Sequence, residues 1–194
     1  MTELVSESST SPASAAALDD ATLAARAREG DVRAYEQLVL RYQGPMFRLA
    51  SRMLADRAEA EDVAQEVFLT AWRRIGQLQD DAAVAGWLYR MTTNRCLNVI
   101  RSRRIPAEVD LDSTESPRTD TRPEHAVQVS GQMAALTAAL AQLTPEQRAC
   151  WLLREVHGQS YEEIAEIVGA NATAVRGRIA RARAQLSEVM QPWR

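Results

Sequence analysis

Hydrophobic residues recur at helical spacing in several separate segments, and the most informative segment is residues 160–183. Ser160 and Glu163 can form a capping box, in which each side chain accepts a hydrogen bond from the other residue's backbone, so a helix is expected to begin here. Gly169 can end that helix in a left-handed turn, and Asn171 can cap a second one. This order predicts a helix-turn-helix, whose second helix enters the major groove of DNA.

The second of these helices has an apolar side and a strongly basic side. Val175 and Ile179 are four residues apart and are expected to face inward. No acidic residue occurs between Glu166 and Glu188. Guanidinium groups bind phosphates and guanine edges well, which favours a DNA-reading helix. The alternative is a helical hairpin whose basic face is simply solvated. The basic residues are Arg176, Arg178, Arg181 and Arg183.

Helical spacing also covers the first half of the chain. The pattern is helical from Asp19 to Met53, where Asp31 can cap a long helix, and again from about Ala58 to Arg74. One face of the 58–74 helix is apolar, with Ala64, Val67, Phe68, Ala71 and Ile75. Its other face presents Asp62, Gln65, Glu66 and Leu69. That second face is either ordinary solvated surface or a partner site, since a leucine lies among carboxylates.

A further helix is predicted from about Ala85 to Arg103, after a turn-like break that contains Asp80 and Asp81. Its apolar residues fit burial, and Trp87 is expected in the core rather than as a stacking platform for a base. Arginines near a helix C-terminus complement the macrodipole, but this run exceeds what capping requires and favours phosphate contact. These arginines are Arg95, Arg101, Arg103 and Arg104.

Periodicity stops between residues 105 and 130. Three prolines and six acids against two arginines predict a flexible acidic linker. Beyond it, helices are expected over Gln132–Gln142 and Glu146–Val156, with Thr144 as the cap before Pro145. Residues 1–18 are rich in Ser, Thr, Ala and Pro and are expected to be disordered.

The sequence therefore predicts an all-α fold of two small helical domains. An N-terminal helical bundle (residues 19–104) and a C-terminal four-helix domain with the helix-turn-helix (residues 131–194) are joined by the linker (105–130). Aromatic residues make up only 5% of the 194 residues, and alanine is abundant, which also favours helices.

The formal net charge is −3, so any nucleic-acid surface must be local. All 23 basic residues are arginines. The sequence has neither a secretory signal nor a long apolar run, so we expect a cytoplasmic protein without membrane insertion.

In this order, the segments resemble bacterial extracytoplasmic-function (group IV) sigma factors of the sigma-70 family, over nearly all of residues 20–190. Residues 60–75 (AEDVAQEVFLTAWRRI) resemble the family's core-binding helix. Residues 85–104 (AGWLYRMTTNRCLNVIRSRR) resemble its promoter-opening and minus-ten-reading helix, and residues 143–186 resemble the domain that reads the minus-thirty-five element.

The resemblance implies an alternative sigma factor that binds core RNA polymerase (the β′ clamp and the β subunit) and promoter DNA, usually under an anti-sigma factor. It implies polymerase contacts at Asp62, Gln65, Glu66 and Leu69. It implies minus-ten contacts at Gln79, Asp80, Asp81, Asn94, Arg95, Asn98, Arg101, Arg103 and Arg104. It implies minus-thirty-five contacts at Asn171, Thr173, Arg176, Arg178, Arg181 and Arg183. The acidic linker would lie in the basic RNA path through the polymerase.

Two positions depart from the family's usual pattern. Residues 174–178 read Ala-Val-Arg-Gly-Arg where the family commonly has Thr-Val-Lys-Ser-Arg, so two hydroxyls are absent. Asp80 and Asp81 would repel phosphate unless each carboxylate accepts from a base amine. The base preferences therefore do not transfer to this chain.

Other classes of function are less consistent with these residues. Neither His125 nor His157 has ligand spacing to Cys96 or Cys150, so we expect no catalytic site, metal or cofactor. A thiol redox switch is the remaining chemical alternative. A stand-alone helix-turn-helix regulator leaves the 60–75 and 95–104 segments unexplained. An adaptor that binds an acidic protein would lack salt-dependent DNA binding with polymerase.

Overall fold

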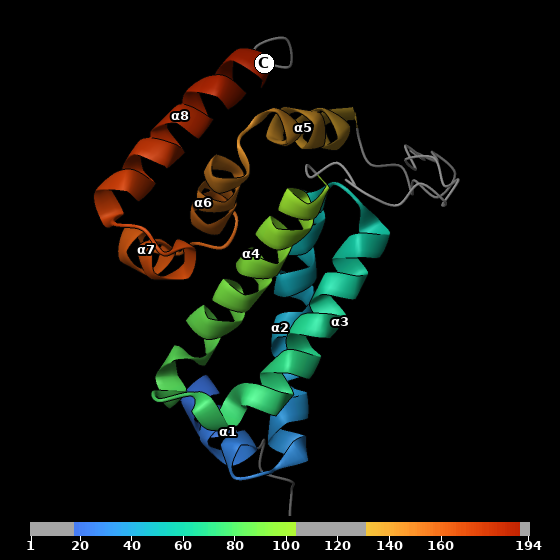
Figure 1. The fold of residues 1–194 in the computed structure, drawn as a ribbon, viewed down its shortest axis with the longest axis vertical. Coiled ribbons are helices and arrows are strands. Elements are labelled where there is room, and N and C mark those ends of the chain that lie inside the picture. The colour runs from blue at the N-terminus through green and yellow to red at the C-terminus, as the bar shows by residue number, and fades with distance from the viewer. Residues whose placement is uncertain (1–17, 104–130, 191–194) are drawn as a thin grey trace, which may run out of the picture.

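The computed structural model of the chain describes residues 18–103 and 131–190 (Figure 1). Within those two ranges the chain forms α-helices and short 3-10 helices, with no strand, so the predicted all-α fold is confirmed. The acidic linker and Arg104 lie outside the described residues, as does the predicted disordered tail except for Leu18.

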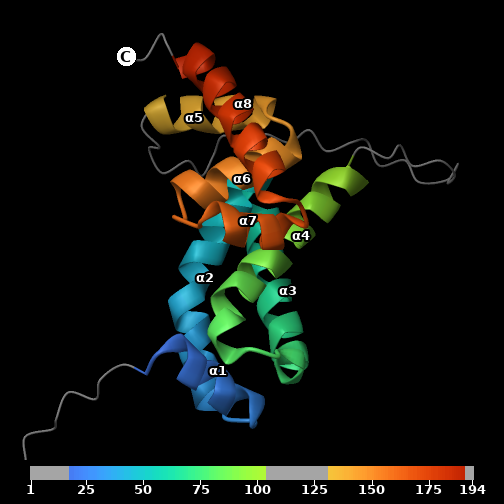
Figure 2. The same ribbon diagram turned by 90° about the vertical axis from the view of Figure 1, so that its left-hand side faces the viewer.

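The N-terminal bundle consists of three long helices and a short one. The short helix crosses an end of the others (Figures 1 and 2). Its core is fully buried at Leu38, Met46, Leu49 and Leu88. Burial of each such side chain contributes about 1.5–3 kcal/mol. The elements are α1 (Asp20–Arg28), α2 (Val32–Leu54), α3 (Arg57–Arg74), the 3-10 helices η1 (Ile75–Gln77) and η2 (Asp81–Ala83), and α4 (Val84–Ser102).

The C-terminal module has four helices, and its last two form the predicted helix-turn-helix. Gly169 ends the first of the pair with φ +64°, a left-handed conformation that L residues with a Cβ rarely adopt. Val175 and Ile179 of the second helix are buried, as expected. The elements are α5 (Gly131–Gln142), α6 (Pro145–Glu155), α7 (Tyr161–Val168) and α8 (Ala172–Met190).

The predicted helix caps are confirmed by their hydrogen bonds. Asp31 accepts from the backbone N–H of Arg33 and of Ala34 at 3.0 and 3.1 Å. Ser160 accepts from the Glu163 N–H at 3.1 Å, and the Glu163 carboxylate accepts from the Ser160 N–H at 2.6 Å. That backbone bond lowers the pKa of Glu163.

Three more side-chain caps start helices elsewhere in the chain. Thr144 and Gln147 form a second capping box, which starts α6. Asn171 accepts from the Ala174 N–H at 2.8 Å and starts α8. Asp56 accepts from the Glu59 N–H at 2.9 Å and starts α3.

The two modules contact each other directly, which the sequence does not predict. α7 and α6 pack against α4, and α6 and α5 also contact α2 (Figure 1). We call the contact made by Met53, Tyr89, Arg148 and His157 the seam. The Tyr89 hydroxyl lies 3.1 Å from Nδ1 of His157, and their rings meet edge to face with centroids 5.2 Å apart.

Arg148 of α6 is the charged member of the seam and is only 8% exposed. Its guanidinium donates to the Met53 carbonyl at 2.5 Å, and to the Ala141 carbonyl near the end of α5 at 2.9 Å. Carbonyls at helix C-termini lack intrahelical donors, so a buried arginine can satisfy several of them at once.

His157 is held neutral at the seam. Burial lowers its pKa to about 4, and the positive charges of Arg48 and Arg52 act in the same direction. Because the imidazole has an ordinary pKa near 6.5 in the unfolded chain, the unfolded state binds a proton first as the pH falls.

We therefore expect the stability contributed by His157 to be present above about pH 6.5 and to be lost progressively as the pH falls towards 4. Thermal unfolding of the wild type at pH 7.5, 6 and 5 should show a larger fall in Tm than His157→Gln, whose amide does not titrate. Parallel pH profiles of the two proteins would contradict this assignment.

Candidate functional site

The predicted polymerase-binding residues share one outward face of α3. Asp62, Gln65, Glu66 and Leu69 are all exposed, and 52% of the Leu69 surface is accessible. An accessible leucine between carboxylates is a surface that can lose water on binding a partner.

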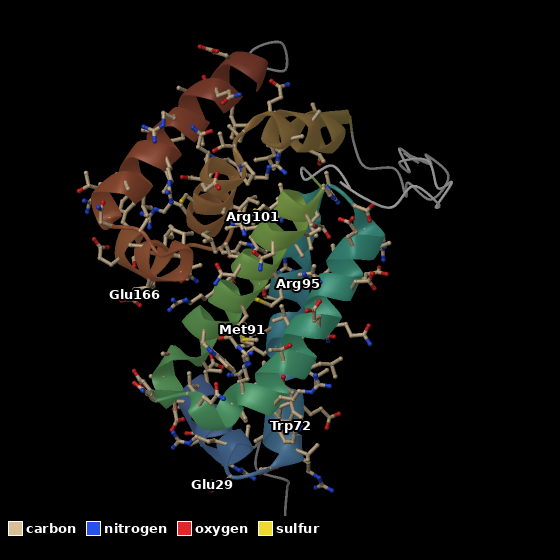
Figure 3. The ribbon with its side chains drawn as sticks, in the orientation of Figure 1. Glu29, Trp72, Met91, Arg95, Arg101 and Glu166 are labelled. Atoms are coloured by element: carbon tan, nitrogen blue, oxygen red, sulfur yellow. The ribbon has the colours of Figure 1, made fainter. Side chains whose placement is uncertain are left out.

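A groove of about 510 Å³ runs beside this face, between α2 and α3. We call it the apolar groove. The Tyr35 hydroxyl donates to the Phe68 carbonyl across it at 2.5 Å, and the Tyr35 ring lies 4.8 Å from the Trp72 ring. Figure 3 places Trp72 beside these two helices. Its lining consists of Val32, Tyr35, Val39, Gln43, Ala64, Gln65, Phe68, Leu69 and Trp72.

The groove modifies one prediction and adds residues that the sequence analysis missed. Ala64 and Phe68 were expected on the core face of α3, but they are only half-buried because they form the groove wall. Val32 and Trp72 were not singled out, and they are 63% and 37% exposed. The available signal was a large apolar residue at a helix position that should face solvent. Leu69 is such a residue, and the same criterion could have identified Val32 and Trp72.

Ion pairs connect the α3 face to the basic helix α4. Glu66 accepts from Nε of Arg95 at 2.6 Å, and Figure 3 places Arg95 between α4 and α3. Glu59 pairs with Arg103 in the same way, and Arg103 also donates to the Leu54 carbonyl at 3.3 Å. Two of the predicted minus-ten arginines are thus held by acids of α3.

The loop before α4 has its two adjacent carboxylates in different environments. Asp80 accepts from the Ala82 N–H at 3.0 Å and so caps η2. Asp81 lies 3.3 Å from the guanidinium of Arg28, which also donates to the Leu78 carbonyl. Arg28 offsets part of the negative charge of Asp81. It lies in α1, 53 residues earlier in the chain, and residue spacing does not indicate a pair so far apart.

Three of the predicted minus-ten residues of α4 face outward. Asn94 and Asn98 are exposed, and Arg101 donates to the Asn98 amide oxygen at 2.9 Å. Gln79 is exposed in the preceding loop. Trp87 is half-buried and packs against the core, while part of it lines the cleft described next.

This interdomain cleft, of about 630 Å³, separates the loop from the helix-turn-helix. One wall contains loop residues such as Gln79 and Asp80, together with Trp87 and Arg90 of α4. The opposite wall contains Glu163 and Glu166 of α7, and Figure 3 labels Glu166 at the edge of that helix.

The arginines of α8 divide by accessibility. Arg176 is exposed, and its guanidinium lies 3.3 Å from Glu162 and 5.1 Å from the centre of the Tyr161 ring. Arg181 is exposed, and Arg183 pairs with Glu155 at 2.6 Å. Arg178 is less accessible than these three arginines, because it is half-buried and lies against the Cys150 thiol.

The polar residues at the start of α8 complete this surface. Thr173 is exposed, whereas the Asn171 side chain is engaged in its cap. A Cβ at Gly177 would meet only the flexible end of Arg181, at 3.4 Å, so the helix has room for a side chain there.

Both thiols are buried. Burial raises the pKa of Cys96 to about 12 and also raises that of Cys150, which the adjacent Arg178 opposes. A protonated, buried thiol is a poor nucleophile. Among residues 18–103 and 131–190, no group of His, Cys, Asp and Glu side chains is arranged to hold a metal ion. None of the helices in those ranges is long and apolar enough to cross a membrane.

Comparison with known proteins identifies the family. The chain matches the family models "Sigma-70 region 2" over residues 38–105 and "Sigma-70, region 4" over residues 133–186. The RNA polymerase sigma-H factor of Pseudomonas aeruginosa is 37% identical over 182 residues, which cover 89% of this chain and 94% of that protein. The chain belongs to the sigma-70 family. It is an extracytoplasmic-function sigma factor, a subunit that binds core RNA polymerase and directs promoter-specific initiation.

Other relatives agree with this sigma factor assignment. The extracytoplasmic-function sigma-E factor of Escherichia coli K12 is 33% identical over 185 residues, 90% of this chain and 96% of that protein. Of the solved structures, CnrH in complex with the cytosolic domain of CnrY matches with a TM-score of 0.71 and 28% identity, over 89% of this chain and 97% of CnrH. The sigma factor RpoE of Bartonella quintana, in complex with the anti-sigma factor NepR, shares the fold, with a TM-score of 0.64 and 22% identity over 82% of this chain and 98% of that one.

The different burial of two α8 arginines in this sigma factor predicts different stabilities. Arg178→Ala should lower the free energy of unfolding by about 1–2 kcal/mol, since it removes packing against α6. Arg176→Ala should change it by less than about 0.5 kcal/mol, because an exposed ion pair contributes little. Urea unfolding of both variants measures the difference, and equal losses would be inconsistent with the half-buried position of Arg178.

Proposed function

We propose that this sigma factor uses three separate surfaces during initiation: the α3 face with the apolar groove for polymerase, the loop and α4 for the minus-ten element, and α8 for the minus-thirty-five element. The observation that carries the proposal is the order of these surfaces along one chain. An accessible apolar groove edged by acids comes first, and two arginine-bearing faces on different modules follow it.

The α3 face supplies the contact with the clamp of the polymerase β′ subunit. Leu69 and Trp72 offer accessible apolar area, which would form the dry centre of an interface. Asp62 and Glu66 lie beside it and would meet basic groups of the clamp. Carboxylates at an interface rim contribute mainly to the rate and orientation of association.

The loop and α4 hold the opened minus-ten strand. Gln79 and Asp80 present polar groups next to the interdomain cleft, where an extruded base can be bound. Asn94, Asn98 and Arg101 continue this surface along α4. Arg95 and Arg103 join it when they leave their partners on α3.

The α8 helix reads the minus-thirty-five duplex. Arg176 is the residue best placed for a base edge, because it is exposed near the N-terminal end of the helix. Arg181 and Arg183 grip the backbone, and Thr173 can donate to a phosphate. Arg178 contributes to this surface from its position next to Cys150.

We propose that an anti-sigma factor controls this chain, and the support is one solved structure of the same fold, the sigma factor RpoE in complex with the anti-sigma factor NepR. We propose that the chain acts in the cytoplasm, in polymerase and on DNA, and that it performs no catalysis of its own. The acidic linker would follow the RNA path through the polymerase.

Run-off transcription tests the function. Core polymerase with this protein should give a specific transcript from a cognate promoter identified by genome-wide occupancy mapping. Asp62→Arg should weaken binding to core polymerase roughly tenfold, because it places a cation against basic clamp groups. Glu188→Arg, which makes the same charge change at an exposed position of α8, is the control and should bind normally.

No transcript with any mapped promoter, despite sequence-specific duplex binding, would instead support a stand-alone helix-turn-helix regulator. Equal core binding by Asp62→Arg and by the control would remove α3 as the docking face.

Promoter reading by α8 has its own test. Arg176→Ala should weaken binding of the holoenzyme to the promoter by roughly 1–3 kcal/mol and relax the preference at one base pair of the minus-thirty-five element. Arg183→Ala should weaken binding to all sequences about equally. Selection from a randomised minus-thirty-five library measures both, and an unchanged preference in Arg176→Ala would overturn this role.

A further inference from the structure

We propose that Arg28 of α1 is a positioning residue for the loop before α4: it keeps Asp81 turned away from the interdomain cleft, so that a single loop carboxylate, that of Asp80, faces the DNA. We call residues 77–83 the reading loop. This inference rests on the proposed function, in which the reading loop binds an extruded base of the minus-ten strand. It adds a residue from the first helix of the chain, which the proposed function leaves without a role.

The reading loop rests on α1. This helix packs against η1, which leads into the loop, and against η2, which lies within it. Figures 1 and 2 show α1 at the end of the bundle where the chain passes from α3 to α4. Leu78 of the loop is buried, and so is Ala27, the residue before Arg28. The loop backbone is therefore held close to α1, where a side chain at the end of that helix can act on it.

Arg28 contacts the reading loop at two points. Its Nη1 donates to the Leu78 carbonyl at 3.1 Å, and its Nη2 lies 3.3 Å from Oδ2 of Asp81. The guanidinium is planar and presents its donors in a fixed fork, so the two contacts also fix their mutual geometry. Gln79 and Asp80, the two loop residues assigned to the extruded base, lie between these points in the chain. Arg28 thus holds the reading segment at both ends.

Asp81 is turned away from the cleft. The lining of the interdomain cleft includes residues 77–80, 82 and 83, and Asp81 is the one residue of the reading loop that does not belong to it. Within the described part of the chain, Oδ1 of Asp81 is buried and has no hydrogen-bond partner, so the carboxylate depends on the contact of Oδ2 with Arg28. A partly buried carboxylate that loses its cation is unfavourable, and it would turn towards water. Because the loop residues on either side open on the cleft, that water lies in the cleft.

Asp80 has the opposite orientation. It is exposed, it lines the cleft, and its Oδ1 accepts from the Ala82 N–H at 3.0 Å, so Oδ2 can accept from DNA. A carboxylate accepts from the exocyclic amine of cytosine or adenine, and it repels phosphates. A second carboxylate in the cleft would strengthen both effects. Arg28 therefore sets the balance between overall affinity for the strand and preference for amino-bearing bases.

Binding of the holoenzyme to a labelled single-stranded oligonucleotide tests this role. With the minus-ten region of the mapped promoter, Arg28→Ala should weaken binding roughly threefold to tenfold, the repulsion expected from one added charge a few ångströms from a phosphate near a protein surface. Arg28→Lys keeps the cation and should lie closer to the wild type. Arg26→Ala is the matched control, since Arg26 belongs to the same helix but pairs with Asp31 at 2.6 Å, and it should bind normally. Binding to the minus-thirty-five duplex should be unchanged in all three, which also shows that they are folded.

Base preference provides a readout that a loss of stability would not change. Oligonucleotides that carry cytosine or thymine at each position of the minus-ten strand in turn locate the extruded base. At that position Arg28→Ala should favour cytosine over thymine roughly twofold to fivefold more than the wild type does, because a second carboxylate can accept from the cytosine amine.

A double variant shows whether Arg28 acts through Asp81. Asp81→Asn alone should leave the affinity for the strand within about twofold of the wild type, because this carboxylate faces away from the cleft. Arg28→Ala combined with Asp81→Asn should return to the same range, since the released side chain no longer carries a charge. A direct bond from Arg28 to a phosphate would instead leave the double variant as weak as Arg28→Ala, and this result would overturn the proposal.

Hydrogen exchange of the free chain measures the position of the loop without DNA or polymerase. The Ala82 and Ala83 amides bond to the side chain and to the carbonyl of Asp80, both at 3.0 Å. Arg28→Ala should speed their exchange roughly tenfold, because the loop loses two contacts with α1, whereas Arg26→Ala should not. Equal exchange rates in the two variants would overturn the proposal.

The outcomes separate this inference from the proposed function. Specific binding of the minus-ten strand by the wild type that Arg28→Ala leaves unchanged would overturn the inference alone. Failure of the wild-type holoenzyme to prefer the minus-ten strand over a scrambled strand would overturn the minus-ten role of the reading loop, and the inference with it.

Discussion

The guanidinium of Arg148 is the interaction on which the arrangement of the modules depends. A buried cation is unfavourable unless polar groups surround it, and here the groups are backbone carbonyls at helix ends. The Ala141 and Leu143 carbonyls belong to its own module, while the Met53 carbonyl belongs to the other. The Met53 bond therefore joins the two modules, whereas the bonds to Ala141 and Leu143 lie within the C-terminal module. One side chain thus serves both the stability of a module and its attachment to the next.

His157 also takes part in the contact between the two modules. His157 follows the end of α6 and inserts an edge of its ring against Tyr89, with two arginines of α2 nearby. A neutral imidazole can pack in that position, whereas a charged one would be repelled. The packing of His157 on Tyr89 and their hydrogen bond thus add to the Arg148–Met53 bond and to the helix contacts between the modules.

Much of the architecture follows from local sequence signals. The capping boxes at Ser160 and Thr144, together with Gly169, mark helix boundaries by direct backbone chemistry, and the structure has helices where these signals place them. The basic face of α8 is similarly local, because it depends only on spacing along one helix. The exposure of Leu69 follows from its place among carboxylates, and this is the part of the proposed docking surface that a sequence can reveal.

What the sequence does not reveal depends on residues far apart in the chain. Periodicity assigns Phe68 to the core, but its burial depends on whether α2 covers it, and α2 leaves a groove there. Arg178 has the same spacing signal as Arg176, yet only the packing of α6 against α8 turns one inward. The contacts of Arg28 with Asp81 and of Arg148 with Met53 join segments separated by dozens of residues. Residue spacing carries no information about such pairs.

The ion pair between Glu66 and Arg95 has a consequence for how this family can diversify. In the function proposed above, its acid belongs to the surface that binds the shared polymerase, and its base belongs to the surface that reads a particular set of promoters. A lineage that acquires new target genes by changing the arginine leaves an unpaired acid facing the polymerase. Drift on one side of the bundle is therefore restrained by selection on the other, and substitutions at the two positions should accumulate together across descendants.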